Sequence, residues 1–391
     1  MLDKAKGAVI QMFIQIDKLV YLLFKATTKV DKRLIVFEGT GGFDESSWVL
    51  YHYLKAKGKY KFVWMLGKPS KYKNEHDTKF LTRRYRSFSF VAADYYYAKA
   101  GYSFYTHMTS FAKPKREGQI VVFIGHGYAI KGHKGNGNSY HNFDYALAIG
   151  EEAICTQALF VGCTPDKMLP LGLPRNDLLL RNNRSGNENP FTRGRKYSKV
   201  IMWMPTFREA NNALSESSCA TETGLPLLDT PNKMEGLNEY LLSQNFLIIL
   251  KIHRLQLQKE IFNREFSNIV IINDADIDEL GLQLYQVIGL SDALLTDYSS
   301  VSVDYLLLDK PIGYVLSDID LYVQDRGFTS NDPRDVMAGH LIYSVDDLYD
   351  FFSDLSEGKD EYREKRHCLR KRLHKAERGN SCELIADYFG L

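Results

Sequence analysis

The stretch RLIVFEGTGGFDESSWVLYHYLKAKGKYKFVWMLG (residues 33–67) indicates the fold class. It opens with an apolar run (33–39), passes through a glycine-rich turn, continues as an amphipathic segment (47–58) and closes with a second apolar run (61–67). Short apolar runs bounded by glycine are typical of buried strands. Strands that alternate with helical segments predict a parallel sheet covered on both faces. The stretch therefore predicts a strand–helix–strand unit.

The same alternation continues along the chain. Further strands are predicted at QIVVFIGHG (119–127), YALAIG (145–150), KVIMWMP (199–205), FLIILKIHR (246–254), SNIVIIND (267–274), DALLTDYSS (292–300) and KPIGYVL (310–316). Residues 181–197 have no apolar period and are rich in Asn, Gly and Arg, which indicates a linker. A chain of 391 residues is also too long for one ordinary core. We therefore expect two doubly wound, Rossmann-like α/β domains, at 33–180 and 198–391, that face a cleft.

The first 32 residues read as a separate segment. Its apolar residues fall at helical spacing, at Val9, Met12, Phe13, Ile16, Val20, Leu23 and Phe24. Asp17 and Lys18 interrupt the run, which is also too short to span a bilayer. A basic amphipathic helix of this kind can lie in a membrane interface. The alternative is a helix packed on its own domain, and the residues favour neither.

Composition excludes several classes of protein. The chain has 50 basic and 48 acidic residues and a net charge of +2, whereas a nucleic-acid binder would show a clear basic surplus. The five cysteines are odd in number and include no CxxC pair. A disulfide framework or a zinc site is therefore not expected, and a reducing cytosol is the simplest location.

Polar residues follow several of the predicted strands directly, where open α/β sheets place their ligands. His126 stands between Gly125 and Gly127 after a buried strand. A neutral imidazole in that place can take a proton from an alcohol. The alternative is a loop histidine that is hydrogen-bonded to backbone.

The predicted C-terminal domain has three such strand ends. They carry Thr206 and Arg208, then Lys251 and His253, and finally Asp297, Ser299 and Ser300. Arginine and lysine suit phosphate, and a helix that opens with two serines offers free N–H groups and hydroxyls to a diphosphate. Exposed side chains and simple helix capping are the alternatives.

Taken in order, the motifs resemble the CDP-glycerol glycerophosphotransferase family of teichoic-acid and capsule polymer synthesis. They are HGYAIK (126–131), GLPRND (172–177), MPTFRE (204–209), KIH (251–253) and TDYSSVSVDYLLLDKP (296–311). The resemblance covers roughly residues 33–387. The chain departs from the family pattern at Gly125, at Tyr128–Ala129 and at Glu209, which are Trp, Thr-Pro and Asp in the family motifs.

The resemblance implies a glycosyltransferase-B-like fold and transfer of a polyol-phosphate unit, with release of CMP. It implies a CDP-polyol donor and a lipid-linked or polymeric acceptor at the cytoplasmic face of the membrane. His126 resembles the family's general base. The expected substrate-binding residues are Gly127, Lys131, Arg175, Thr206, Arg208, Lys251, His253, Asp297, Ser299 and Ser300. The resemblance implies no certain cofactor, and it leaves open whether the reaction depends on a divalent metal.

Three other functions remain beside this one. CDP-ribitol is a close alternative donor to CDP-glycerol. A sugar transferase of the same fold would use a nucleotide-sugar. A non-catalytic membrane scaffold would agree with the altered residues around His126.

Overall fold

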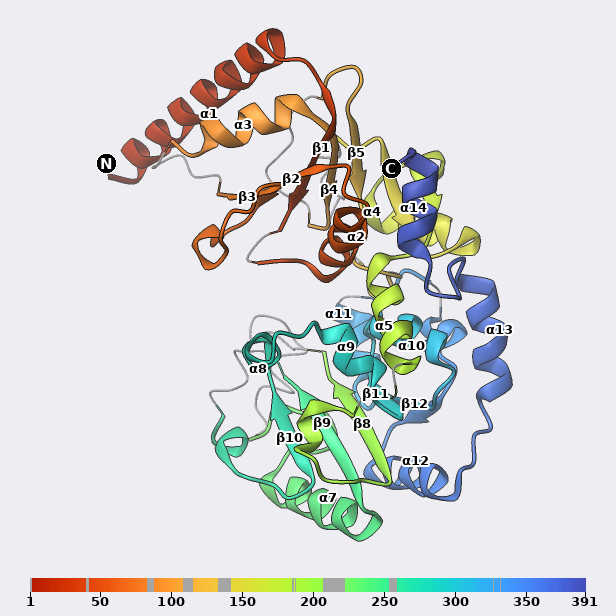
Figure 1. Cartoon of the computed structure of the whole chain (residues 1–391). Coiled ribbons are helices and arrows are strands. Elements are labelled where there is room, and N and C mark those ends of the chain that lie inside the picture. The colour runs from red at the N-terminus through yellow and green to blue at the C-terminus, as the bar shows by residue number, and fades with distance from the viewer. Residues whose placement is uncertain are drawn as a thin grey trace.

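The computed structural model describes residues 2–39, 42–82, 88–107, 115–132, 142–184, 186, 188–206, 222–252, 259–325, 327–330 and 332–391. The chain forms two parallel sheets with helices packed on them (Figure 1). The predicted α/β class with two parallel sheets is therefore confirmed. Arg208 and His253, two of the predicted site residues, lie outside the described residues.

The N-terminal sheet has seven strands in the order β3-β2-β1-β4-β5-β6-β7. The strands are β1 (Asp31–Glu38), β2 (Lys61–Met65), β3 (Thr78–Leu81), β4 (Ala100–Tyr105), β5 (Ile120–Phe123), β6 (Tyr145–Ala148) and β7 (Met168–Pro170). The helices of this half are α1 (Leu2–Thr27), α2 (Glu45–Ala56), α3 (Phe90–Lys99), α4 (Ile154–Val161) and α5 (Pro174–Arg184), with 3₁₀ turns at Pro69–Lys71, Glu151–Ala153 and Pro165–Lys167.

The C-terminal sheet has six strands in the order β10-β9-β8-β11-β12-β13. The strands are β8 (Lys199–Met204), β9 (Phe246–Lys251), β10 (Ile269–Ile272), β11 (Ala293–Thr296), β12 (Ile312–Val315) and β13 (His340–Ile342). The helices are α7 (Pro231–Gln244), α8 (Asp274–Glu279), α9 (Leu284–Gly289), α10 (Val301–Tyr305), α11 (Ile319–Asp325), α12 (Val345–Glu357), α13 (Arg363–Leu373) and α14 (Ser381–Phe389). Short 3₁₀ turns lie at Pro190–Thr192, Glu260–Asn263, Leu306–Leu308 and Pro333–Val336.

The central strands are buried on both faces, which explains their continuous apolar runs. Residues 34–38 of β1 are all buried, and so are all four residues of β11. Both sheets reverse their strand order in the middle, between β1 and β4 and between β8 and β11. In open parallel sheets, the carboxyl ends of the strands at this reversal form the binding crevice.

The C-terminal helices return to the N-terminal half, where α14 lies beside α2 (Figure 1). The hydroxyl of Tyr102 on β4 donates a hydrogen bond to the carbonyl of Phe389 at 3.1 Å. Lys57 Nζ donates to the backbone oxygen of Leu391 at 2.9 Å. Helix α5 ends at Arg184, so it includes the first residues of the predicted linker (181–197). The predicted domain boundaries stay predictions.

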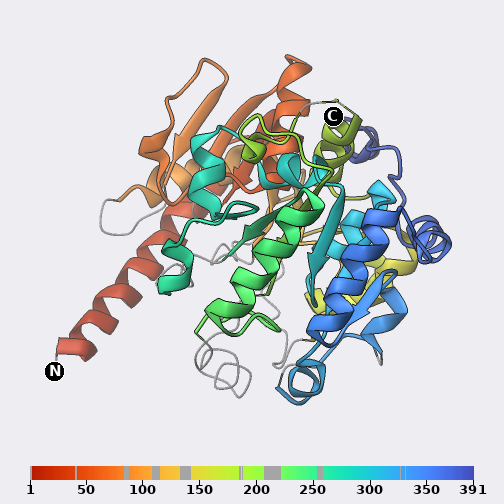
Figure 2. The same cartoon turned by 90° about the horizontal axis from the view of Figure 1, so that it is seen from below.

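Helix α1 packs on α3, while its N-terminal end extends away from the rest of the chain (Figure 2). Phe24 contacts Tyr95 of α3 edge to face, at 5.5 Å between ring centres. Asp17 and Tyr21 are the buried residues of the described part of α1. Four large apolar side chains of α1 remain exposed: Met12, Leu19, Leu22 and Leu23. The residues of the predicted apolar stripe therefore do not all face the same surroundings. Phe24 contacts α3, whereas Met12 and Leu23 face solvent.

Candidate active site

His126 lies in the loop that follows β5, between two glycines in the left-handed region. Their φ angles are +77° at Gly125 and +103° at Gly127. These values are easily adopted only by glycine. A Cβ at residue 127 would also stand 2.4 Å from the Arg175 guanidinium. Gly127 thus allows the close approach of Arg175 to the loop, whereas its predicted substrate contact stays a prediction.

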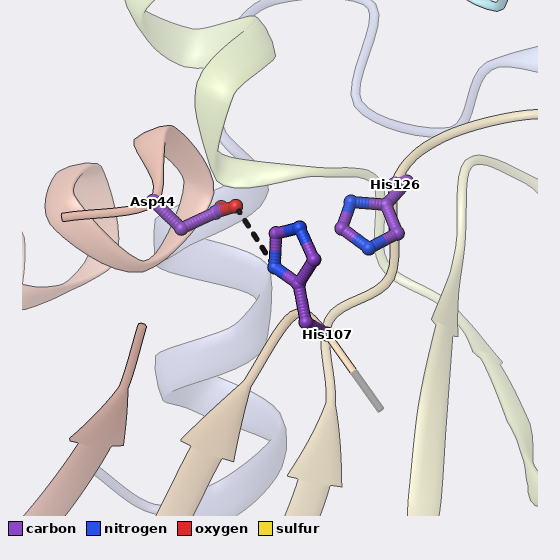
Figure 3. Close-up of side chains that lie close together, drawn as sticks. All are labelled: Asp44, His107 and His126. Carbon is purple, nitrogen blue, oxygen red and sulfur yellow. Dashed lines mark ion pairs between the residues drawn. The ribbon is translucent and has the colours of Figure 1, made fainter. Parts of the chain in front are cut away.

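His107 and Asp44 lie next to His126 (Figure 3). The rings of His107 and His126 meet edge to face, with 4.2 Å between their centres. The nearer carboxylate oxygen of Asp44 is 3.8 Å from His107 Nδ1. The three residues follow β1, β4 and β5, which are neighbours in the sheet, so the carboxyl ends of these strands bring them together.

The surroundings of His126 keep its imidazole neutral. Burial lowers the pKa of His126 to about 4, and the nearby His107 and Arg175 lower it as well, against an opposing effect of Asp44. Protein groups lie around the ring, and His126 as a residue remains exposed to solvent. A neutral, accessible imidazole can accept a proton at physiological pH.

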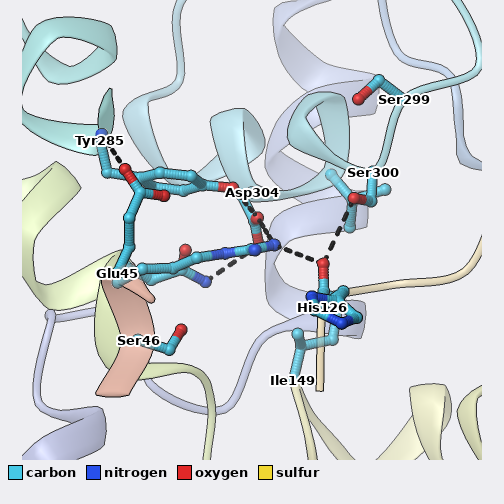
Figure 4. A network of polar contacts seen from close by, with 12 residues as sticks. Glu45, Ser46, His126, Ile149, Tyr285, Ser299, Ser300 and Asp304 are labelled. Atoms are coloured by element: carbon cyan, nitrogen blue, oxygen red, sulfur yellow. Dashed lines mark hydrogen bonds and ion pairs between the residues drawn. The ribbon is translucent and has the colours of Figure 1, made fainter. Parts of the chain in front are cut away.

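Figure 4 shows a polar network that includes His126, Tyr285 and Asp304, and Arg175 hydrogen-bonds to two of these residues. Its guanidinium donates hydrogen bonds to the carbonyl of His126 at 2.8 Å and to the carboxylate of Asp304 at 2.5 Å. Asp304 also accepts hydrogen bonds from the Tyr285 hydroxyl at 2.5 Å and from the Asn176 amide at 3.1 Å. Burial opposes the charge of Arg175, but Asp304 and Tyr285 outweigh this effect and raise the pKa of Arg175. The structure therefore gives Arg175 a supporting role, and its predicted contact with the donor stays a prediction.

Glu45 connects this network across the two halves of the chain. It is the first residue of α2, and its carboxylate accepts a hydrogen bond from the backbone N–H of Tyr285 at 3.1 Å. Burial raises the pKa of Glu45 to about 7, although Arg175 acts against this rise.

Lys131, Thr206 and Asp297 meet where the two halves face each other. Lys131 Nζ donates a hydrogen bond to the Thr206 hydroxyl at 2.9 Å. The backbone N–H of Thr206 donates to the Asp297 carboxylate at 2.8 Å, and the Thr206 hydroxyl donates to the same carboxylate. Thr206 follows β8 and Asp297 follows β11, so these residues stand at the point where the strand order reverses. Three predicted site residues are therefore brought together.

The serine pair lies close to His126. Ser300 precedes α10, and its hydroxyl is 3.5 Å from the carbonyl of His126. Ser299 lies on the same turn, and both side chains are half-buried. Phosphate bound at this helix start would stand beside the candidate base.

Lys251 lies at the end of β9, where it forms an ion pair with Asp274 at 2.9 Å. Asp274 lines a cavity of about 450 Å³ between the two halves. The other residues that line it are Gly42, Phe43, Glu45, Lys68, Lys71, Tyr72, Ile277, Asp278, Leu282, Gln283 and Leu284. The cavity therefore extends from the loop that contains Asp44 to the helix that follows β10.

Sequence reasoning missed Asp44, Glu45, His107, Tyr285 and Asp304. His107 had a usable signal, because it follows an apolar strand at its carboxyl end, as His126 does. Asp44 precedes α2 as its N-cap, which is the pattern of an ordinary helix start.

Among the described residues, Asp44, His107 and His126 are also the group whose potential metal-binding atoms all lie within 4.8 Å of one another. A carboxylate with two imidazoles is a combination that zinc accepts.

The chain resembles known proteins in sequence. The family model for "CDP-Glycerol:Poly(glycerophosphate) glycerophosphotransferase" matches residues 20–389. A teichoic acid poly(glycerol phosphate) polymerase of Staphylococcus epidermidis is 25% identical over 405 residues, which cover 95% of this chain and 52% of the relative. A teichoic acid ribitol-phosphate primase of Bacillus spizizenii is 25% identical over 193 residues, which cover 48% of this chain and 45% of the relative. The chain spans about half the length of these relatives.

The fold is also that of a solved structure. The structure of the wall teichoic acid polymerase TagF superposes with a TM-score of 0.73 at 22% sequence identity, and the match covers 100% of this chain and 97% of that chain. This likeness shows a shared arrangement of the two α/β halves.

Proposed function

Because the chain belongs to the CDP-glycerol:poly(glycerophosphate) glycerophosphotransferase family, whose members are polyol-phosphate transferases, we propose that it transfers glycerol phosphate from CDP-glycerol to a hydroxyl of a teichoic-acid or capsular polymer. The observation that carries the proposal is a neutral imidazole on His126, a residue whose backbone carbonyl lies 3.5 Å from the hydroxyl of Ser300 at the start of α10 on the facing half. This proximity supports a proton acceptor at His126 next to a phosphate site at the serine pair.

The reaction is a phosphoryl-type transfer. The acceptor hydroxyl oxygen attacks the phosphorus that bears glycerol, a new P–O bond forms, and the bond from this phosphorus to CMP breaks. His126 takes the hydroxyl proton, and CMP leaves with the electron pair. Developing charge is met by Ser299, Ser300 and Lys131, since such transfers depend chiefly on positioning and electrostatics. By family resemblance, Arg208, Lys251 and His253 contribute to the same task.

A donor screen tests this function. The purified protein is given CDP-glycerol, CDP-ribitol or a UDP-sugar with a teichoic-acid acceptor, and released nucleotide is measured. The proposal expects CMP from CDP-glycerol. CMP released from CDP-ribitol alone would identify the chain as a ribitol-phosphate transferase. The similarity to a ribitol-phosphate primase is the reason for including this donor. UDP release would identify a sugar transferase, and no release from any donor would favour the scaffold.

The serine pair gives a first prediction about donor binding. Replacing Ser299 and Ser300 with alanine weakens CDP-glycerol binding, because each lost hydrogen bond to a charged group is worth about 1.5–3 kcal/mol. Calorimetry measures this change, and Ser317→Ala, at an exposed position of the same half, is the control. Unchanged affinity in the folded double variant would leave the pair with a purely structural role.

We also propose that α1 attaches the enzyme to the cytoplasmic face of the membrane, where a lipid-linked acceptor would lie. Its Met12, Leu19, Leu22 and Leu23 side chains are 51–67% exposed. Lys18 and Lys25 lie on the same helix, and Lys29, Lys32 and Arg33 follow it in the sequence. Exposed leucines beside basic residues suit an anionic lipid interface. No helix in the described part of the chain is both long and apolar enough to cross a bilayer.

A leucine substitution tests the attachment without removing the contact between α1 and α3. Changing Leu19, Leu22 and Leu23 together to serine lowers binding to anionic vesicles by about ten-fold or more, because a buried leucine contributes roughly 1.5–3 kcal/mol. Vesicle co-sedimentation measures this. Leu159 and Leu242, which are 72% and 59% exposed on other helices, give the matched serine control. Equal sedimentation of both variants would exclude α1 as the anchor.

A further inference from the structure

Asp44 lies against two neighbouring groups, one at each of its carboxylate oxygens. One of its carboxylate oxygens accepts a hydrogen bond from the backbone N–H of Ser46 at 3.2 Å and so caps α2. The other oxygen faces His107 Nδ1 at 3.8 Å. The same His107 nitrogen lies 3.1 Å from the hydroxyl of the buried Thr106. The capping bond holds one oxygen of the carboxylate, and Nδ1 of His107 thus lies between the other oxygen and the Thr106 hydroxyl.

The oriented His107 ring in turn borders His126. The two rings meet at an interplanar angle of 67°, so the edge of one ring lies on the face of the other (Figure 3). Rotation of the His126 side chain in that direction would collide with His107. On the backbone side, the carbonyl of His126 accepts the hydrogen bond from Arg175. The side chain and the backbone of His126 are thus held from two sides.

The contact between the two rings also affects the charge state of His126. Two imidazoles this close repel each other when both are protonated. Asp44 is next to His107, so it forms an ion pair with that ring whenever His107 carries a proton. The charged and titratable groups that act on His126 are His107 and Arg175, which lower its pKa, and Asp44, which raises it.

From this geometry we propose that Asp44 and His107 form a positioning pair for His126: the carboxylate orients the His107 ring, and that ring holds the His126 imidazole in the orientation that receives the acceptor proton. The proposal rests on the proposed function, because it assigns His126 as the base. Neither member of the pair needs to touch the substrate.

Three single variants test the pair. His107→Asn removes the ring, and Asp44→Asn removes the carboxylate charge but keeps a good N-cap for α2. His52→Asn is the matched control, because His52 is exposed on α2 and contacts Trp48 instead of the site. We expect CDP-glycerol affinity within about two-fold of wild type in all three. Turnover falls by about ten-fold in the two site variants and is unchanged in the control.

The pH profile separates positioning from a general loss of structure. His107 lowers the pKa of His126, so its removal raises that pKa and moves the acid limb of turnover to higher pH. A variant that merely folds less well loses activity equally at every pH. Unchanged turnover and an unchanged acid limb in His107→Asn overturn the proposal. Loss of wild-type activity on chelation, with recovery on adding Zn²⁺, also overturns it, in favour of a metal site.

A measurement that does not depend on enzyme activity tests the positioning pair independently of the proposed function. The His126 ring is titrated by NMR in wild type and in His107→Asn, with His126→Ala used to assign the signal. The proposal expects the His126 titration to move to higher pH in the variant, even if no donor is turned over. An unmoved titration overturns the pair by itself, whereas a shifted titration without CMP release from any donor overturns the proposed function alone.

Discussion

Replacing His126 with alanine slows CMP release by roughly 10²–10⁴-fold, the usual contribution of a positioned general base, and leaves donor affinity nearly unchanged. The reason is that, in the proposed function, the imidazole serves only as proton acceptor and the donor phosphates bind to the facing half. Because the pKa of His126 is lowered to about 4, the ring is already neutral at pH 7, and wild-type turnover stays near its maximum from neutral pH down to about pH 5. CMP release at saturating donor and acceptor, together with calorimetric donor affinity, measures both effects.

Two further histidines sharpen this prediction. His253→Ala weakens donor binding and turnover together, because its proposed contact is with the phosphate. His52→Ala, at an exposed position on α2, keeps wild-type behaviour. Wild-type turnover in a folded His126→Ala variant would contradict the assignment of the base and favour the scaffold alternative.

Local patterns predicted most of the strands in the two sheets, but not the short strands β3, β7 and β13. The apolar run at 199–205 contains β8 and the run at 246–254 contains β9, because a strand buried on both faces must be apolar along its whole length. The same reasoning placed His126, Thr206 and Asp297 after strands. Within one sheet, parallel strands bring their carboxyl ends to one edge, which agrees with the contact of Thr206 with Asp297.

Contacts between distant segments were not predictable from these patterns. Asp44 has the signature of an N-cap, and only the tertiary fold places its second oxygen near His107. Arg175 resembles a phosphate ligand in sequence, yet Asp304, 129 positions further along the chain, pairs with it. Asp17 interrupts an apolar run, yet it is buried at the contact of α1 with α3. Each outcome depends on a partner that lies far away in the sequence.

We expect the loss of Asp304 to destabilise the chain strongly. Its side chain is fully buried and accepts hydrogen bonds from Arg175, Tyr285 and Asn176. Asp304→Ala leaves the Arg175 guanidinium buried without its counter-charge, which costs about 3–5 kcal/mol. We expect a clear drop in melting temperature and a loss of activity as the His126 loop loses its support. Thermal unfolding measures the first effect, and Asp350→Ala, at an exposed position on α12, is the control.

A double variant distinguishes two possible causes of the lost stability, an unpaired buried charge and a cavity at residue 304. Replacing Arg175 with methionine in the Asp304→Ala background removes the buried charge, so part of the lost stability returns. A cavity alone would not respond in this way, because the second substitution adds no volume at residue 304. Activity is not expected to return, since methionine donates no hydrogen bond to the His126 carbonyl. A double variant less stable than Asp304→Ala would show that the stability comes from packing around Arg175 instead of from the ion pair.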